Sequence, residues 1–155
     1  MVIQIDTREK KFELARIERQ IEKCGAKTIH SKLYVGDYQS LDNPRLVIDR
    51  KKDLLEICSN VCQQHERFQR ELMRARDAGI EIIILCEHGR DISTMEDIYF
   101  WDNPRLKESP KATKGETLYK TLCTIRDRYN IRFEFCDKRN TGKRIIELLK
   151  GGDDG

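Results

Sequence analysis

The 155-residue sequence lacks several features that would assign a protein to a class at once. Its apolar runs stay well short of the roughly 18 residues that span a bilayer, and no signal-peptide pattern precedes the strand-like residues 2–6. We therefore expect no membrane association and a cytoplasmic location. The sequence also has no internal repeat, no low-complexity tract and neither of the phosphate-binding loops GxxxxGK(S/T) and GxGxxG.

A disulfide framework is not indicated either. There are six cysteines, but none of them forms a CxxC pair, and most lie inside apolar periodic segments. Free thiols in the core are therefore the favoured interpretation. Cys58, Cys62 and His65 have the spacing of three ligands on one helical face, so a metal site there is the less favoured alternative.

Charge is abundant and unevenly distributed. Asp, Glu, Lys and Arg make up 37% of the chain, with a net charge of +3. Residues 103–150 hold 13 Lys/Arg against 6 Asp/Glu, whereas residues 1–102 hold 17 against 19. A basic C-terminal third favours a polyanionic partner, although a solvated charged face is an equally ordinary explanation.

Hydrophobic patterning predicts one α/β domain over residues 1–150, with a mixed central sheet flanked by helices, and a disordered tail over 151–155. Residues 80–86 form a continuous apolar run typical of a central strand. From 99 to 115 periodicity is lost, which predicts a long mobile loop carrying Lys107, Lys111 and Lys114. The remaining predicted strands are 2–6, 28–34, 37–41, 46–49 and 131–136, and the predicted helices are 11–23, 52–62, 66–78, 117–129 and 141–150.

Acidic residues at predicted strand ends suggest a reactive centre. Asp37 begins one strand of a predicted hairpin, and Asp49 and Lys51 end the other. Residues i and i+2 of a strand share a face, so Asp49 and Lys51 point the same way and Arg50 points oppositely. Two carboxylates suit Mg²⁺, whose bound water can attack a phosphodiester, and the Lys51 ammonium can hold the phosphate.

Further residues could join this centre. Asp6 ends another predicted strand, where a third carboxylate could face the same metal, and Arg8 follows; a surface ion pair is the alternative. Arg67 lies on a predicted helix beyond the hairpin, where an arginine-rich face could bind phosphates or simply be solvated. The pattern of an acid, a loop and D-x-K is short, so these residues alone leave the function open.

Several segments in succession resemble the XPF-type nuclease domain of the PD-(D/E)XK, restriction-endonuclease-like superfamily, in particular small standalone phage or mobile-element members. The similar segments span residues 2–149: 3–9, 35–38, 47–51, 67–72, 80–85 and 114–118. The resemblance implies a restriction-endonuclease-like core and Mg²⁺ or Mn²⁺ as cofactor. It further implies Asp6, Asp37 and Asp49 as catalytic, metal-binding carboxylates and Lys51 as the catalytic lysine.

By the same resemblance, Arg8 and Arg50 would support phosphates or neighbouring carboxylates, and with Arg67 and Lys114 they are the expected DNA-binding residues. The family usually has Glu-Arg-Lys where this chain has Asp49-Arg50-Lys51. The primary hypothesis is a metal-dependent endonuclease acting near DNA branches or junctions. It would be nucleoid-associated, with a homodimer or protein partner as a further option. The alternatives are a non-catalytic DNA-binding scaffold of the same fold and a small α/β enzyme acting on nucleotides.

Overall fold

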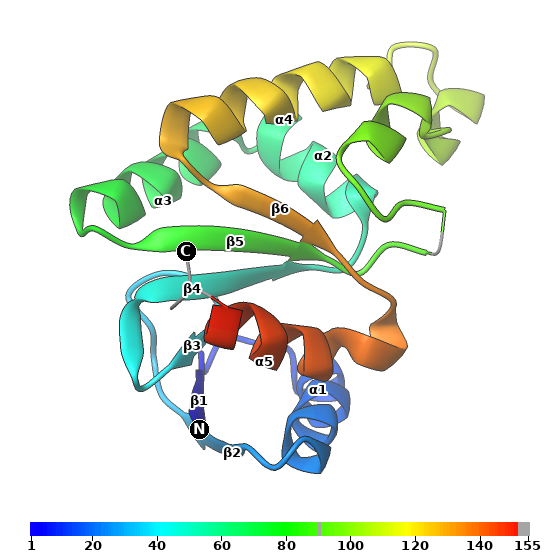
Figure 1. Ribbon diagram of the computed structural model, residues 1–155. Coiled ribbons are helices and arrows are strands. Elements are labelled where there is room, and N and C mark those ends of the chain that lie inside the picture. The colour runs from blue at the N-terminus through cyan, green and yellow to red at the C-terminus, as the bar shows by residue number, and fades with distance from the viewer. Residues whose placement is uncertain (90, 152–155) are drawn as a thin grey trace.

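A single mixed sheet forms the centre of the computed structural model, which describes residues 1–89 and 91–151 (Figure 1). The strand order is β2-β1-β3-β4-β5-β6. The β1–β2, β4–β5 and β5–β6 pairs are parallel, and the β1–β3 and β3–β4 pairs are antiparallel. The strands are β1 (Val2–Ile5), β2 (Lys27–His30), β3 (Tyr38–Ser40), β4 (Asn43–Lys51), β5 (Glu81–Cys86) and β6 (Arg132–Phe135).

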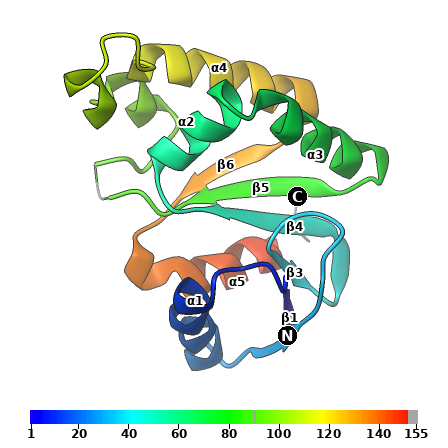
Figure 2. The same cartoon turned by 180° about the vertical axis from the view of Figure 1, so that it is seen from behind.

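Helices cover both faces of the sheet, as Figures 1 and 2 show. One face carries α1 (Lys11–Lys23) and α5 (Thr141–Gly151); the other carries α2 (Leu54–Cys62), α3 (His65–Asp77) and α4 (Gly115–Tyr129). Strand β5 serves both cores, because Ile83 and Leu85 pack with α1 and α5 whereas Ile82 and Ile84 pack with α2, α3 and α4. This two-sided burial explains the uninterrupted apolar run in its sequence.

The predicted fold class is confirmed: an α/β fold with a mixed central sheet and flanking helices. Among the described residues, no helix is both long enough and apolar enough to cross a bilayer. The predicted helix 141–150 extends to Gly151. The rest of the predicted disordered tail, residues 152–155, lies outside the described residues, and the domain boundary at 150 stays a prediction.

Two local predictions were wrong: the end of one strand and the unstructured character of residues 99–115. Strand β2 ends at His30 instead of residue 34, because the Leu33 amide donates to the side chain of Asp6 and not to a neighbouring strand. The helix predicted over 11–23 is confirmed with the same bounds; it buries Ile17 and Ile21, while Phe12 is 88% exposed.

The segment 99–115 is not an unstructured loop. It contains part of the 3-10 turn η1 (Glu96–Phe100) and all of η2 (Pro104–Lys107). Buried Trp101 anchors it to the core beside α4. Buried Asn103 accepts from the Arg105 amide and donates to the Thr113 carbonyl, so one side chain closes the segment on itself. A third 3-10 turn, η3 (Lys138–Asn140), precedes α5.

The cysteines are free, as expected, but they do not all lie in the core. Cys58 and Cys86 are buried, whereas Cys24 and Cys62 are exposed. The alternative metal site is not supported, because Cys62 ends α2 and His65 begins α3, so the three residues do not share one helical face. No group of three His, Cys, Asp or Glu within residues 1–89 and 91–151 is arranged to hold a metal ion.

Candidate active site

The predicted hairpin is present and brings Asp37 next to β4. Strand β3 pairs with β4 in antiparallel register, with Tyr38 opposite Ile48. The Asp37 amide donates to the Ile48 carbonyl at 2.8 Å, just before β3 begins. Gly36 makes this approach possible: its φ is +81°, and a Cβ there would lie 2.9 Å from the side chain of Val47. The Gly-Asp pair therefore places the carboxylate by close packing on β4.

The side chains of Asp37 and Asp49 lie together in one opening of about 320 Å³, which Lys51 also lines. Asp37 Oδ2 accepts from the Arg50 amide at 2.8 Å, which fixes this carboxylate against β4. Burial raises the pKa of Asp37 well above its ordinary value, and the negative charges of Asp49 and Glu9 raise it further. Two carboxylates that repel one another in a partly desolvated site are a suitable pair for a divalent cation.

Lys51 shares this environment. Its Nζ lies 3.5 Å from Asp49 Oδ2 and 5.9 Å from the centre of the Phe68 ring of α3. Burial alone would lower the pKa of Lys51, but the charges of Asp49 and Glu56 outweigh it, so the pKa is raised. The lysine is therefore charged at neutral pH and sits beside the acidic pair.

The carboxylate of Asp6 is not part of this group. Its Oδ2 accepts from Arg8 Nε at 2.7 Å, and its Oδ1 accepts from the Leu33 amide at 2.8 Å. Asp6 contacts the hairpin through its backbone, where the Asp6 amide donates to the Asp37 carbonyl at 2.8 Å. Burial raises the pKa of Asp6, but the Arg8 and Leu33 hydrogen bonds more than offset it, so the pKa is lowered. The structure thus gives the ion pair that the sequence left as an alternative, and a metal-binding role for Asp6 stays a prediction.

Arg50 points to the opposite face of the sheet, as the strand alternation predicted. It donates to both carboxylate oxygens of Glu9, at 2.9 and 3.0 Å, and to Glu87 Oε1 at 2.6 Å. Glu87 also binds Arg16 at 2.7 Å and the hydroxyl of Thr141. Of the two roles expected for Arg50, this arrangement favours the support of neighbouring carboxylates over contact with a phosphate.

The other two basic residues singled out by sequence are exposed. Arg67 on α3 lines a hollow together with Lys51 and Phe68, so it lies near the lysine of the site. Lys114 is the residue before α4, and it does not line the hollows that hold Asp37 or Lys51. The structure therefore brings Arg67 to the site and leaves Lys114 apart from it.

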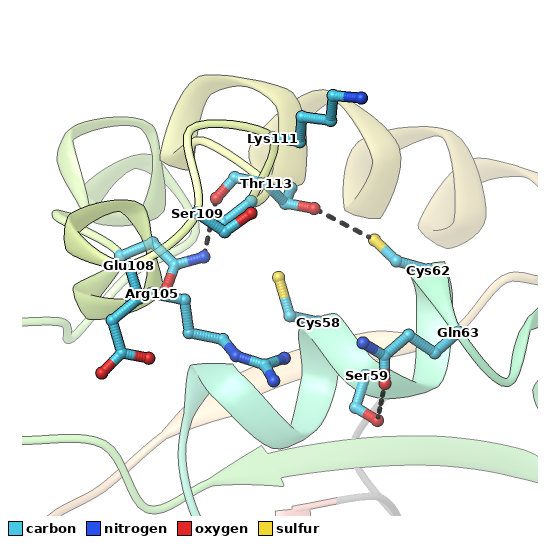
Figure 3. Close-up of a pocket in the computed structure, with 11 residues that line it drawn as sticks. Cys58, Ser59, Cys62, Gln63, Arg105, Glu108, Ser109, Lys111 and Thr113 are labelled. Atoms are coloured by element: carbon cyan, nitrogen blue, oxygen red, sulfur yellow. Dashed lines mark hydrogen bonds between the residues drawn. The ribbon is translucent and has the colours of Figure 1, made fainter.

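A larger hollow, of about 390 Å³, lies between α2 and the segment before α4 (Figure 3). Cys58 and Arg105 point toward it, and Cys62 Sγ contacts the Thr113 hydroxyl at 3.4 Å. Burial raises the pKa of Cys58 to about 11, so its thiol is neutral at pH 7 and is a poor nucleophile or metal ligand. The acidic pair is absent from its lining, so this hollow is a secondary feature.

Sequence reasoning missed three glutamates that shape the site. Glu9 and Glu87 hold Arg50, and Glu71 of α3 lies within the electrostatic reach of Asp49. Glu87 follows the strongest predicted strand directly, so the signal that drew attention to Asp6 was present there too. Glu71 carried no such local signal, because it lies in the middle of a charged helix.

Comparison with known proteins agrees with this architecture. A family model, the ERCC4 domain, matches residues 5–149. The structure is similar to XPF from Aeropyrum pernix, with a TM-score of 0.66, 19% identity and 98% of this chain covered. It is also similar to the same protein in complex with DNA, with a TM-score of 0.68, 18% identity and 99% of this chain covered. This chain spans 61% and 65% of those two chains. The comparison with curated proteins gave no match.

Proposed function

Because the chain belongs to the ERCC4 domain family, the XPF-type nuclease domain, we propose that it is an endonuclease that hydrolyses DNA phosphodiester bonds with Mg²⁺ or Mn²⁺. The observation that carries the proposal is the grouping of Asp37, Asp49 and Lys51 at the β3–β4 hairpin. The Aeropyrum pernix protein with the same fold has been seen with DNA, which supports DNA as the substrate.

In this proposal Asp37 and Asp49 hold the cation, since hard carboxylate oxygens are its preferred ligands. When bound, the metal ion supplies Lewis-acid polarisation of a phosphate oxygen and a water of lowered pKa. Lys51 holds the scissile phosphate and offsets the charge that develops on it, because its ammonium is fixed beside Asp49. Asp6 orients Arg8, and it is the third carboxylate proposed for the metal site.

The remaining residues either bind DNA or hold the catalytic residues in position. Arg8, with a side chain 61% exposed, lines the same opening as the acidic pair, and Arg67 lines the neighbouring hollow with Lys51. In this proposal both arginines contact DNA phosphates near the cut. Lys114 would contact DNA farther along the duplex. Arg50 acts by positioning, because its amide orients Asp37 while its guanidinium anchors β4 to Glu9 and Glu87.

We further propose selectivity for branched DNA or for junctions between single and double strands, in line with the resemblance to XPF-type domains. Assembly as a homodimer or with a protein partner, and a cytoplasmic, nucleoid-associated location, are predictions of the same kind. They rest on the family resemblance and not on the geometry of the site.

The test is incubation with labelled flaps, forks, duplexes and single strands in Mg²⁺, Mn²⁺ or EDTA. Cleavage in Mg²⁺ or Mn²⁺ and its loss in EDTA are expected. Asp49→Asn should abolish cleavage, since it removes ligand charge at nearly constant shape, and Asp42→Asn, at the exposed turn of the same hairpin, should not. Binding of DNA without any metal-dependent cleavage would instead identify a non-catalytic scaffold.

A further inference from the structure

Tyr34 presents an aromatic ring to solvent on the segment that leads from β2 to Asp37. It is 59% exposed, although its neighbours Leu33 and Val35 are both buried. The Leu33 amide is held by the carboxylate of Asp6, and Val35 packs in the core with α2 and α3. The backbone is thus fixed on both sides of Tyr34, so the fold itself holds the ring outward.

Arg74 of α3 covers one face of this ring. Its guanidinium carbon lies 4.6 Å from the ring centre, and its Nη2 donates to the Tyr34 carbonyl. Figure 2 shows the segment between β2 and β3 arching close to α3. Because Arg74 occupies one face and Tyr34 keeps more than half of its surface accessible, the opposite face is open to a second planar group.

The stacked pair is joined to the proposed active site by hydrogen bonds. Arg8 Nη2 donates to the Leu33 carbonyl at 3.2 Å, next to Tyr34 in the chain. The same guanidinium binds Asp6, whose amide donates to the Asp37 carbonyl. A nucleotide whose phosphate lay at Arg8 would therefore have its base within reach of the Tyr34 ring.

Helix α3 provides a second link. Glu71 lies one turn before Arg74, so both residues share a face of the helix. Burial and the charge of Asp49 raise the pKa of Glu71, while Lys51, Arg74 and Arg8 pull it the other way. Glu71 thus lies within electrostatic reach of both Asp49 and Arg74.

We propose that Tyr34 and Arg74 form a stacking platform for one unpaired base of the DNA substrate, next to the scissile phosphate. The inference rests on the proposed nuclease function and adds residues that select single-stranded DNA beside a junction. Every base has a face that can stack on an aromatic ring, so the platform tolerates any sequence. A base inside a duplex is already stacked on both sides and cannot reach Tyr34 unless it is flipped out.

The experiment measures binding of the full chain to two forked DNAs in Ca²⁺, so that hydrolysis does not interfere. One fork has a normal unpaired arm, and the other has abasic sites in the nucleotides next to the junction, which keeps every phosphate. The parent should bind the abasic fork about 5- to 150-fold more weakly, the range expected for loss of one stacked base. Tyr34→Ala should bind the normal fork more weakly by a similar factor and should not distinguish the two forks.

Two further variants make the comparison specific. Tyr34→Phe keeps the ring and should behave like the parent. Phe100→Ala removes another exposed ring, which contacts Tyr99 of the same 3-10 turn, and should still distinguish the forks.

Equal binding of both forks by the parent, no binding to either, or discrimination retained in Tyr34→Ala would overturn the platform. The nuclease proposal is tested separately by adding Mn²⁺ to the same forks. Discrimination without cleavage would support the platform and refute the nuclease, whereas cleavage without discrimination would refute the platform alone.

Discussion

Replacing Arg50 with alanine would leave two buried carboxylates without their shared partner. The side chains of Arg50 and Glu9 are each 7% exposed, and that of Glu87 is fully buried. Breaking a buried ion pair on one side costs about 3–5 kcal/mol, because the remaining charge stays desolvated. Glu87 keeps its contact with Arg16, and Glu9 keeps the hydroxyl of Tyr38 at 2.8 Å. We therefore expect Arg50→Ala to lower the free energy of unfolding by about 3 kcal/mol, the lower end of this range.

Urea unfolding at pH 7 measures this loss in the free energy of unfolding. Arg126→Ala is the matched control, since its ion pair with Asp127 is exposed and such pairs contribute about 0–1 kcal/mol. Domains of this size are stable by about 5–15 kcal/mol, so Arg50→Ala is severe and could prevent folding. Arg50→Lys keeps the charge but cannot form all three of these hydrogen bonds to carboxylate oxygens. It should therefore lose less unfolding free energy than Arg50→Ala.

Equal losses of unfolding free energy in Arg50→Ala and Arg126→Ala would show that the buried ion pairs of Arg50 do not stabilise the fold. DNA affinity gives a second readout, because a positioning residue and a phosphate contact differ there. Arg50→Lys should bind DNA in Ca²⁺ as tightly as the parent. A drop in its affinity without a loss of stability would show instead that Arg50 contacts the phosphate backbone.

Other charged residues should affect unfolding and DNA binding in ways that can be measured. Asp37→Asn should raise the free energy of unfolding at pH 7 without metal by about 0.5–2 kcal/mol. The reason is that the raised pKa of Asp37 reflects a carboxylate whose ionisation opposes folding. An unchanged or lower free energy in urea unfolding would contradict this. Glu9 acts oppositely, because burial raises its pKa but Arg50 lowers it more. Its contribution to the free energy of unfolding should therefore be present above the ordinary glutamate pKa and lost as pH falls toward the lower pKa of the folded state. A Glu9→Gln variant should lose less stability over this acidic range. Arg67→Ala and Lys114→Ala should each weaken DNA binding by a similar factor for unrelated DNA sequences, and each should make the affinity less dependent on salt. If the affinity of the parent for DNA did not change with salt, phosphate contacts would be excluded as the basis of binding.

The sheet was predictable because its sequence signals are local. Alternation and apolar runs identified the strands and α-helices of the described residues, including the two strands of the hairpin. The i, i+2 relation placed Asp49 and Lys51 on one face and Arg50 on the other, as the structure confirms. Backbone geometry alone fixes these relations once a residue is known to be in a strand.

Partners from distant parts of the chain were not predictable. Arg50 meets Glu9 and Glu87, which are 41 and 37 residues away, and nothing in the local sequence selects them over other acids. Asp6 ends its strand as expected, but Arg8 two residues later captures its carboxylate. The segment 99–115 lost its periodicity because its order comes from single buried anchors such as Asn103, which leave no repeating pattern.

In the proposed function, Lys51 acts on the scissile phosphate beside the Asp37–Asp49 pair. Single-turnover cleavage at saturating enzyme, measured together with DNA binding in Ca²⁺, separates this role from a purely structural one. Lys51→Ala should bind DNA nearly as the parent does but cleave about 10²- to 10³-fold more slowly, the cost of removing one preorganised charge at a reacting centre. Lys52→Ala, which removes the adjacent exposed lysine of the same opening, should cleave at close to the parent rate. If Lys51→Ala cleaves as fast as the parent, Lys51 is structural and the proposed active site is wrong.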